Sequence, residues 1–241
     1  MPVLRRLIAV ATCNRPQFAL RALAQRDTWV GLLVKRRDPN TDIRFFVGRG
    51  DRPLGPLEVR LDVEDSYERL PEKVQAIFRY AVDAGFDYVF KTDDDTFINP
   101  NVLLDDCEVF PHHYVGNVRP ATGGYPAPYA SGYAYWLSRA AMQVIVESPI
   151  TLDPNEDRWV GNSLLKAGIH PMRDSFHYRI IYPDGIGNPT TIWSADSNIG
   201  HAAVFAQLPP TYMDRTFKSY NRLFKYYNQT HRKPRVKLVA V

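Results

Sequence analysis

The hydrophobic residues in the first part of the chain recur in two patterns, short continuous runs and helical spacing, which predict alternating strands and helices. Continuous apolar runs are typical of strands that are buried on both faces, as in a parallel sheet. Two helices are expected between these runs, one opening near Pro16 and one at Pro71, because proline suits the first turn of a helix. The predicted strands cover residues 4–12, 43–47 and 57–61, together with a central strand that starts at 86 and ends in the aspartates at 93–95.

The alternation continues through the second half of the chain. Ser138 is expected to cap an apolar helix, and Gly168 is expected to end a helix that opens at 153–157. The segment 120–128 is rich in Pro, Gly, Ala and Tyr. Because strand and helix patterns resume directly after it, we interpret it as an active-site loop rather than a linker. The other expected elements are a short helix at 99–106 and strands at 114–118, 133–137 and 176–181.

This order of elements predicts an α/β protein with a wound, mixed sheet flanked by helices. No repeat, low-complexity block or shift in composition divides the chain, so we expect a single catalytic domain at 1–230 and a basic tail at 231–241. An aromatic stripe interleaved with basic residues spans 217–227 at helical spacing. Such a stripe more often packs in a core than binds a membrane, although peripheral membrane contact is the alternative.

Composition narrows the function classes. With 45% hydrophobic and 23% charged residues, the 241-residue chain is ordinary for a globular protein. The net charge of +4 is small and gathers at the C-terminus, which argues against nucleic acid as a partner. No apolar run has the length of a signal sequence or membrane span. The two cysteines, Cys13 and Cys107, favour a reducing compartment, so we expect a cytoplasmic protein, or a Golgi-lumenal one if an anchor has been removed.

Two acidic sites are the candidates for chemistry. Asp93, Asp94 and Asp95 end a predicted strand, where ligands bind in α/β proteins, and adjacent carboxylates must face water or a cation. Glu156 and Asp157 open a predicted helix. Each site alone has an ordinary explanation, as a helix cap or as acids favoured by the helix dipole. Together they match glycosyl transfer, in which one carboxylate site holds a divalent cation and a separate carboxylate deprotonates the attacking hydroxyl.

A series of short motifs accompanies these acidic sites over about residues 4–170. They are Arg26-Asp27-Thr28-Trp29, Phe45-Phe46-Val47-Gly48, Asp65-Ser66-Tyr67 with Leu70 and Lys73, Lys91-Thr92-Asp93-Asp94-Asp95, Tyr125-Pro126 with Tyr129-Ala130-Ser131-Gly132-Tyr133, and Glu156-Asp157 with Val160-Gly161. In this order they resemble the β-1,3-galactosyltransferase and Fringe-related enzymes of glycosyltransferase family 31, which have the GT-A fold. The chain departs from the family pattern at Ala130, where secreted relatives tend to carry Cys, and at Arg158, which replaces a Val.

The resemblance implies a metal site. Asp95 would bind the metal directly, and Asp93 would contact it through water or contact the nucleotide ribose. The family's late histidine ligand best matches His201, with His170 and His177 as competitors. Carboxylates, diphosphate oxygens and one imidazole suit Mn²⁺ or Mg²⁺.

The resemblance also implies roles for the remaining site residues. Asp157 would be the general base, with Glu156 beside it orienting the site. Ser131 and Gly132 would lie under the donor sugar, where a missing side chain lets backbone approach closely. The residues expected to bind the nucleotide sugar are Thr12, Arg15, Arg26, Asp65, Lys73, Lys91, Asp93 and Asp94.

The expected function is therefore that of a metal-dependent inverting glycosyltransferase. It would transfer a sugar from a UDP-sugar to a hydroxyl of a glycan acceptor, with a β-1,3 linkage as the family implies. The alternative is a catalytically inactive nucleotide- or glycan-binding module on the same fold. A two-metal phosphoesterase would need more carboxylate and His ligands near the aspartates, and an EF-hand would need a spaced acidic pattern.

Overall fold

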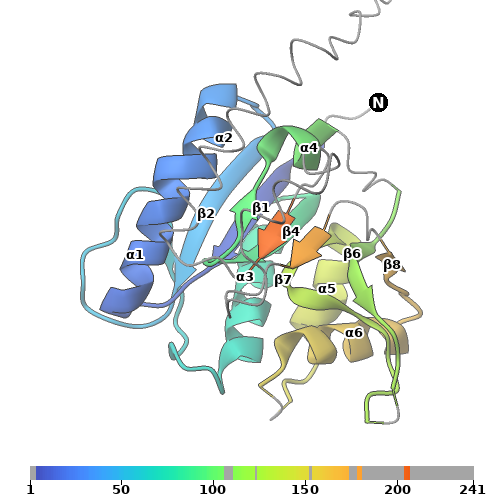
Figure 1. Cartoon of the computed structure of the whole chain (residues 1–241). Coiled ribbons are helices and arrows are strands. Elements are labelled where there is room, and N and C mark those ends of the chain that lie inside the picture. Colours follow the sequence, from blue (N-terminus) through green and yellow to red (C-terminus); the bar gives the residue numbers. More distant parts are fainter. Residues whose placement is uncertain are drawn as a thin grey trace, which may run out of the picture.

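The computed structural model of the chain describes residues 4–105, 111–122, 124–151, 154–173, 178–180 and 204–206 (Figure 1). Its centre is a seven-stranded sheet with the order β3-β2-β1-β4-β7-β6-β8. A small sheet, which the sequence patterns do not predict, has the order β5-β10-β9. The strands are β1 (Arg6–Ala11), β2 (Thr41–Val47), β3 (Glu58–Arg60), β4 (Tyr88–Asp93), β5 (Phe97–Ile98), β6 (Tyr114–Arg119), β7 (Tyr129–Ser138), β8 (Met172–Arg173), β9 (Tyr178–Ile180) and β10 (Val204–Ala206).

The directions of the strands bring the acidic sites to one edge of the large sheet. β3, β2, β1 and β4 are parallel, so their carboxyl ends lie together. β7 is antiparallel to both β4 and β6, so its first residues lie at that same edge. Thr92 of β4 is opposite Ala134 of β7. This register brings Gly132 and Tyr133 beside the aspartates that follow Thr92.

Helices cover both faces of this sheet (Figure 1). Successive residues of β1 alternate between the two layers, with Ile8 and Val10 in one core and Leu7, Ala9 and Ala11 in the other. The first core lies under α1 (Pro16–Gln25), the π-helical turn η1 (Arg26–Val30), α2 (Gly31–Arg36) and α4 (Pro100–Asp105), and the second under α3 (Leu70–Asp83), α5 (Arg139–Glu147) and α6 (Glu156–Lys166).

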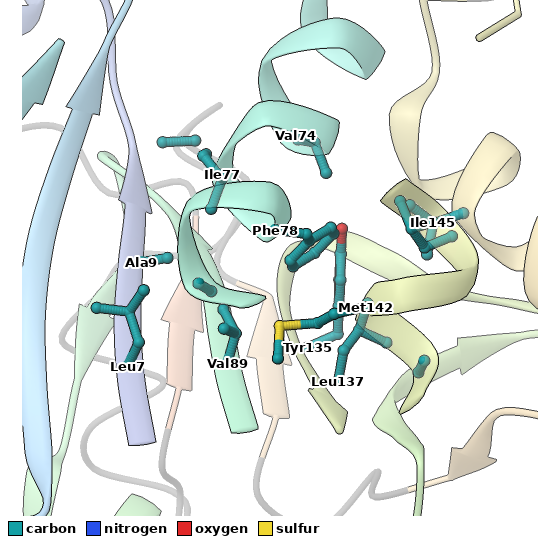
Figure 2. Packing of buried hydrophobic residues seen from close by; sticks show 14 of the residues in the cluster. Leu7, Ala9, Val74, Ile77, Phe78, Val89, Tyr135, Leu137, Met142 and Ile145 are labelled. Atoms are coloured by element: carbon teal, nitrogen blue, oxygen red, sulfur yellow. The ribbon is translucent and has the colours of Figure 1, made fainter. Parts of the chain in front are cut away.

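The apolar face of α3 packs in the second core (Figure 2). Val74, Ile77, Phe78 and Ala81 recur at helical spacing and are fully buried. They pack in the same cluster as residues of β1, β4 and β7 and as Met142 of α5. Burial of each large apolar side chain contributes roughly 1.5–3 kcal/mol. This packing fixes α3 beside the carboxyl ends of β1 and β4, where the acidic residues lie.

Most predicted elements are confirmed, with shifted ends. Ser138 caps α5 as expected, since its Oγ accepts a hydrogen bond of 3.3 Å from the Ala141 N–H. β7 begins at Tyr129, before the predicted strand, and η1 is not predicted at all. Within the described ranges, none of the helices is long and apolar enough to cross a membrane. The stripe at 217–227 and the tail at 231–241 lie outside the described residues.

Candidate active site

Two cavities meet at the carboxyl end of β4. The first, of about 250 Å³, lies beside the end of β1 and α3, and the second, of about 440 Å³, lies beside β7 and the start of α6. Asp93 and Asp95 line both cavities. Asp157 and Glu156 line the second cavity. The expected metal ligand Asp95 and the expected base Asp157 therefore face one shared space.

The first cavity brings together most of the residues expected to bind the nucleotide. Thr12, Arg15, Asp65 and Lys73 line it beside the three aspartates. Lys73 is buried, pairs with Asp65 Oδ1 and donates a second hydrogen bond to the Thr12 carbonyl. Asp65 Oδ2 also accepts the Gly48 N–H at 2.8 Å. These contacts make Asp65 and Lys73 part of the rigid wall of the cavity.

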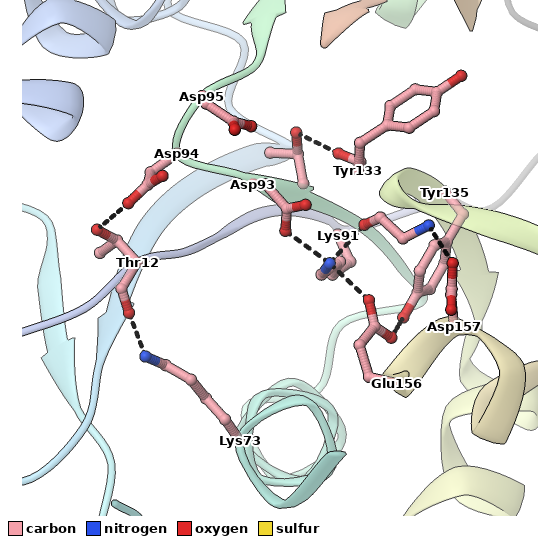
Figure 3. A network of polar contacts seen from close by, with 12 residues as sticks. Thr12, Lys73, Lys91, Asp93, Asp94, Asp95, Tyr133, Tyr135, Glu156 and Asp157 are labelled. Carbon is pink, nitrogen blue, oxygen red and sulfur yellow. Dashed lines mark hydrogen bonds and ion pairs between the residues drawn. The ribbon is translucent and has the colours of Figure 1, made fainter. Parts of the chain in front are cut away.

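Asp94 has a different environment from its two neighbours. Its carboxylate is buried and accepts a hydrogen bond of 2.7 Å from Thr12 Oγ1 (Figure 3). It also accepts one of 3.1 Å from Arg21. These bonds tie the end of β4 to β1 and α1. Asp94 therefore holds the aspartate segment in place, with Asp93 and Asp95 at the border of the two cavities.

Lys91 links Asp93 to Glu156 beside the second cavity (Figure 3). Its ammonium is almost completely buried and lies 2.7 Å from Asp93 Oδ1 and 2.7 Å from Glu156 Oε1. It also donates to the Gly132 carbonyl. Tyr135 completes the network, donating from its hydroxyl to Glu156 Oε2 at 3.0 Å. Lys91, which is expected to bind the donor, joins β4, β7 and α6 through these contacts.

Asp157 is held by backbone donors. Its Oδ2 accepts the Gly132 N–H at 3.0 Å, and its Oδ1 accepts the Arg158 N–H at 2.8 Å. A Cβ on Gly132 would lie 2.8 Å from Glu156 Oε1 and 3.4 Å from Asp157 Cβ. The missing side chain of Gly132 therefore leaves room for the Glu156 carboxylate, while its expected contact with the sugar stays a prediction.

Burial among like charges perturbs the carboxyl groups of the site. Burial, helped by the charges of Asp93 and Asp94, raises the pKa of Asp95 to about 7. Burial also raises the pKa of Glu156 to about 7, against the opposing charge of Lys91. The pKa of Asp157 is raised by burial, although the Gly132 N–H and Lys91 oppose the shift. Such clusters of perturbed acids are typical of functional sites.

Some of the predicted residues lie away from the cavities. Arg26 pairs with Glu58 at 2.9 Å and stacks on the Phe45 ring, and it lines neither cavity. His170 is exposed and also lines neither. His177 and His201 lie outside the described residues. Within the described ranges, no group of three or more His, Cys, Asp or Glu side chains is placed to hold a metal ion.

Several cavity residues were not predicted. Arg21 of α1 lies 3.7 Å from Asp95, and Arg119 at the end of β6 lines the second cavity with Tyr129. Arg21 lies in no recognisable motif. It comes to the site because α1 packs beside the end of β4. Arg119 had a usable signal, since it ends a predicted strand and ligands gather at such ends.

Comparisons with known proteins find sequence similarity to galactosyltransferases. Residues 58–108, which include α3 and the aspartates, match the sequence profile of the family described as Galactosyltransferase. Mouse beta-1,3-galactosyltransferase 6 is 30% identical over 175 residues, which cover 57% of this chain and 53% of the mouse protein. The resemblance to galactosyltransferases is confirmed. The chain spans about half the length of this galactosyltransferase, and the family match ends before β7 and α6.

The fold is similar to that of a glycosyltransferase of known structure. A glycosyltransferase involved in the glycosylation of the major capsid of PBCV-1 superposes with a TM-score of 0.52 at 13% identity, covering 88% of this chain and 98% of that one. At this identity the likeness concerns the fold alone. Together with the mixed seven-stranded sheet between two layers of helices, it confirms the predicted GT-A fold.

Proposed function

We propose that this protein is a metal-dependent inverting glycosyltransferase that transfers a sugar from a UDP-sugar to a hydroxyl of a glycan acceptor. The galactosyltransferase family match and the GT-A fold support a glycosyltransferase. The observation that carries the finer proposal is the cavity of about 440 Å³ that both Asp95 and Asp157 line. A donor held by the aspartates and an acceptor beside Asp157 would meet within this cavity.

The nucleotide diphosphate would occupy the first cavity. Arg15 and Arg21 line it and can donate charge-assisted hydrogen bonds to phosphate oxygens. The exposed ring of Tyr67, which lines both cavities, offers a surface where the cavities meet and the donor sugar would lie. The wall formed by Asp65 and Lys73 would keep this cavity in shape before the donor binds.

The carboxylate ligands where the two cavities meet fit a hard divalent cation such as Mn²⁺ or Mg²⁺. Asp93 and Asp95 supply carboxylate oxygens, which these ions prefer, and diphosphate oxygens would fill further positions. The fit is supported by the raised pKa of Asp95, because burial and the neighbouring carboxylates leave its negative charge undercompensated. When bound, the cation would stabilise the negative charge that develops on the departing diphosphate.

Asp157 would act as the general base. It would take the proton of the acceptor hydroxyl while that oxygen attacks the anomeric carbon, opposite to the bond that breaks to release UDP. The N–H groups of Gly132 and Arg158 fix the orientation of the carboxylate, and its raised pKa makes it a stronger base. Glu156 is occupied by Lys91 and Tyr135, so it would position the helix rather than take the proton. By analogy with the family, the linkage formed would be β-1,3.

The test is UDP release from a panel of UDP-sugars with Mn²⁺ and glycan acceptors. We expect Asp157→Asn to lower turnover by about 100-fold or more, the scale of general-base catalysis, without weakening UDP binding. Asp62→Asn is the matched control, because Asp62 is an exposed surface carboxylate paired with Arg49. Turnover in Asp157→Asn equal to that of the parent would remove Asp157 from the mechanism. UDP binding without turnover on any acceptor would instead support the inactive binding module.

A further inference from the structure

The second cavity is lined by an exposed cationic side chain, Arg119, that has no anionic partner among the residues the structure describes. Arg119, the last residue of β6, donates from Nε to Ser131 Oγ at 3.0 Å. Among the described residues it forms no ion pair, and it is the one cationic side chain that lines this cavity. Four carboxylates, those of Asp93, Asp95, Glu156 and Asp157, line the same cavity without forming an ion pair with Arg119.

The hydrogen bond to Ser131 leaves the two Nη groups of the Arg119 guanidinium available to a ligand. A guanidinium has five N–H donors in a planar fork, and the hydrogen bond to Ser131 uses the Nε donor. The four N–H groups on the two Nη atoms remain, and this fork matches a carboxylate through two parallel hydrogen bonds. Anchoring through Nε also limits the rotation of the group, which lowers the entropy lost when an anion binds.

The surface around Arg119 suits a sugar ring. Arg119 is opposite Tyr129 in the β6–β7 register, and Ser131 and Tyr133 follow on β7 where this register shifts. These three residues of β7 line the cavity. A second side chain of β6, Asn117, donates to the Tyr133 hydroxyl at 2.8 Å, so this wall is braced by cross-strand hydrogen bonds. Aromatic faces and hydroxyl groups are the surfaces that pack against and bind a pyranose.

We propose that Arg119 binds the carboxylate of a hexuronic acid, so that the sugar in the second cavity is an acidic one. This inference rests on the proposed function, since it names the class of sugar that the same cavity takes. A dianionic phosphate would meet one cation among four carboxylates, whereas a carboxylate needs a single fork and carries a single charge. The hexuronic acid belongs to the acceptor or to the donor, because the cavity extends from Asp157 to the junction at Asp93 and Asp95.

Calorimetric titration tests the proposal without requiring turnover. The protein with Mn²⁺ and UDP is titrated with p-nitrophenyl β-D-glucuronide and with p-nitrophenyl β-D-glucoside, which differ in having a carboxylate or a hydroxymethyl group at C6. A second arm titrates the protein and Mn²⁺ with UDP-glucuronic acid and with UDP-glucose. We expect the acidic compound to bind about tenfold more tightly in one arm, and the arm that shows it assigns the sugar to the acceptor or to the donor.

Substitutions connect this preference to Arg119. Arg119→Gln should bring the affinities of the paired compounds to within about twofold, while Arg119→Lys should retain part of the preference because it keeps the charge but loses the fork. Arg49→Gln is the matched control, since it removes a surface guanidinium that lines neither cavity. Thermal unfolding of each variant checks that it is folded.

Equal binding of both paired compounds by the parent in both arms, or a preference that survives in Arg119→Gln, overturns the assignment. Failure of the proposed function has a different signature. A carboxylate-dependent preference with no UDP release toward any acceptor would retain the acidic-sugar site and reject the transferase.

Discussion

The ammonium of Lys91 and the carboxylate of Glu156 lie 2.7 Å apart in the interior, although 65 residues separate them in the chain. Lys91 belongs to β4 and Glu156 is the first residue of α6. Burial alone would lower the pKa of Lys91, but Asp93 and Glu156 raise it, so the lysine stays charged. This pair sets the position of the helix that carries Asp157 relative to the strand that carries the aspartates.

Removal of the Lys91 charge should therefore destabilise the protein. We expect Lys91→Met to lower the free energy of unfolding by about 3–5 kcal/mol, because it leaves the buried carboxylate of Glu156 without its partner. The double variant Lys91→Met/Glu156→Gln should recover part of this loss, since both members of the pair are then neutral. Urea unfolding of the parent, both single variants and the double variant measures the coupling. Additive losses would show that the two side chains do not stabilise one another.

A second prediction concerns the pH dependence of turnover. The pKa of Asp157 is raised by burial, against the opposing effects of the Gly132 N–H, Lys91 and Arg158. A general base must be deprotonated, so activity should rise with pH through the pKa of Asp157, and a raised pKa moves this rise to higher pH. We expect the acid-side fall of kcat/KM for UDP release to lie at higher pH than an ordinary aspartate, whose pKa is about 4, would give. A profile that stays flat down to pH 4, in a protein shown by circular dichroism to be folded, would contradict this role.

The family's motifs predict which residues gather at the site, but they do not predict the contacts that each side chain makes. Alternating apolar runs identified β4 and α6, and the motifs identified the acids at their ends. Lys91 and Glu156 were both singled out, yet their contact depends on the antiparallel pairing of β7 with β4, which leaves no local signal in the sequence. Arg26 shows the converse, because its motif implied the nucleotide pocket whereas the π-helical turn η1 directs its side chain to Glu58.

The role of Arg26 leads to a prediction about stability. Glu58 accepts hydrogen bonds from Arg26, Arg52 and the Gly55 N–H. Burial would raise the pKa of Glu58, but the hydrogen bond from Arg52, followed by those from Gly55 and Arg26, lowers it to about 2. The folded-state pKa is thus below the unfolded value of 4.5. The stabilising contribution is therefore fully present above pH 4.5 and is lost as the pH falls toward 2.

We expect Glu58→Gln to cost about 1–3 kcal/mol of unfolding free energy at pH 7 and less at pH 3. Urea unfolding at the two pH values measures the difference. Asp62→Asn removes an exposed carboxylate of the same loop region and should have little effect at either pH. An equal loss for Glu58→Gln at both pH values would show that the charge of Glu58 does not contribute.

Metal removal gives a further test of the junction between the cavities. UDP with Mn²⁺ should raise the melting temperature of the parent more than UDP alone, because a ligand that binds the folded state stabilises it. Asp95→Ala should lose the Mn²⁺-dependent part of this increase and keep the part due to UDP alone. Addition of EDTA to the parent should reproduce the behaviour of the variant. An undiminished Mn²⁺ effect in Asp95→Ala would place the cation elsewhere.

Gly132 provides the sharpest test of the geometry on which the proposed transfer depends. In Gly132→Ala the added Cβ would lie 2.8 Å from Glu156 Oε1, so the Glu156 carboxylate, which Lys91 and Tyr135 hold, or the start of α6 must shift. Because displacement of a catalytic group by about 1 Å can cost about 100-fold in rate, we expect kcat to fall by 10- to 100-fold. Gly132 does not line the first cavity, so the Kd for UDP with Mn²⁺ should stay within about twofold of the parent value. Gly124→Ala is the matched control, since a Cβ there meets no atom within 4 Å and should leave both quantities unchanged. Full activity in Gly132→Ala would mean that the distance between Asp157 and the aspartates of β4 does not limit the reaction.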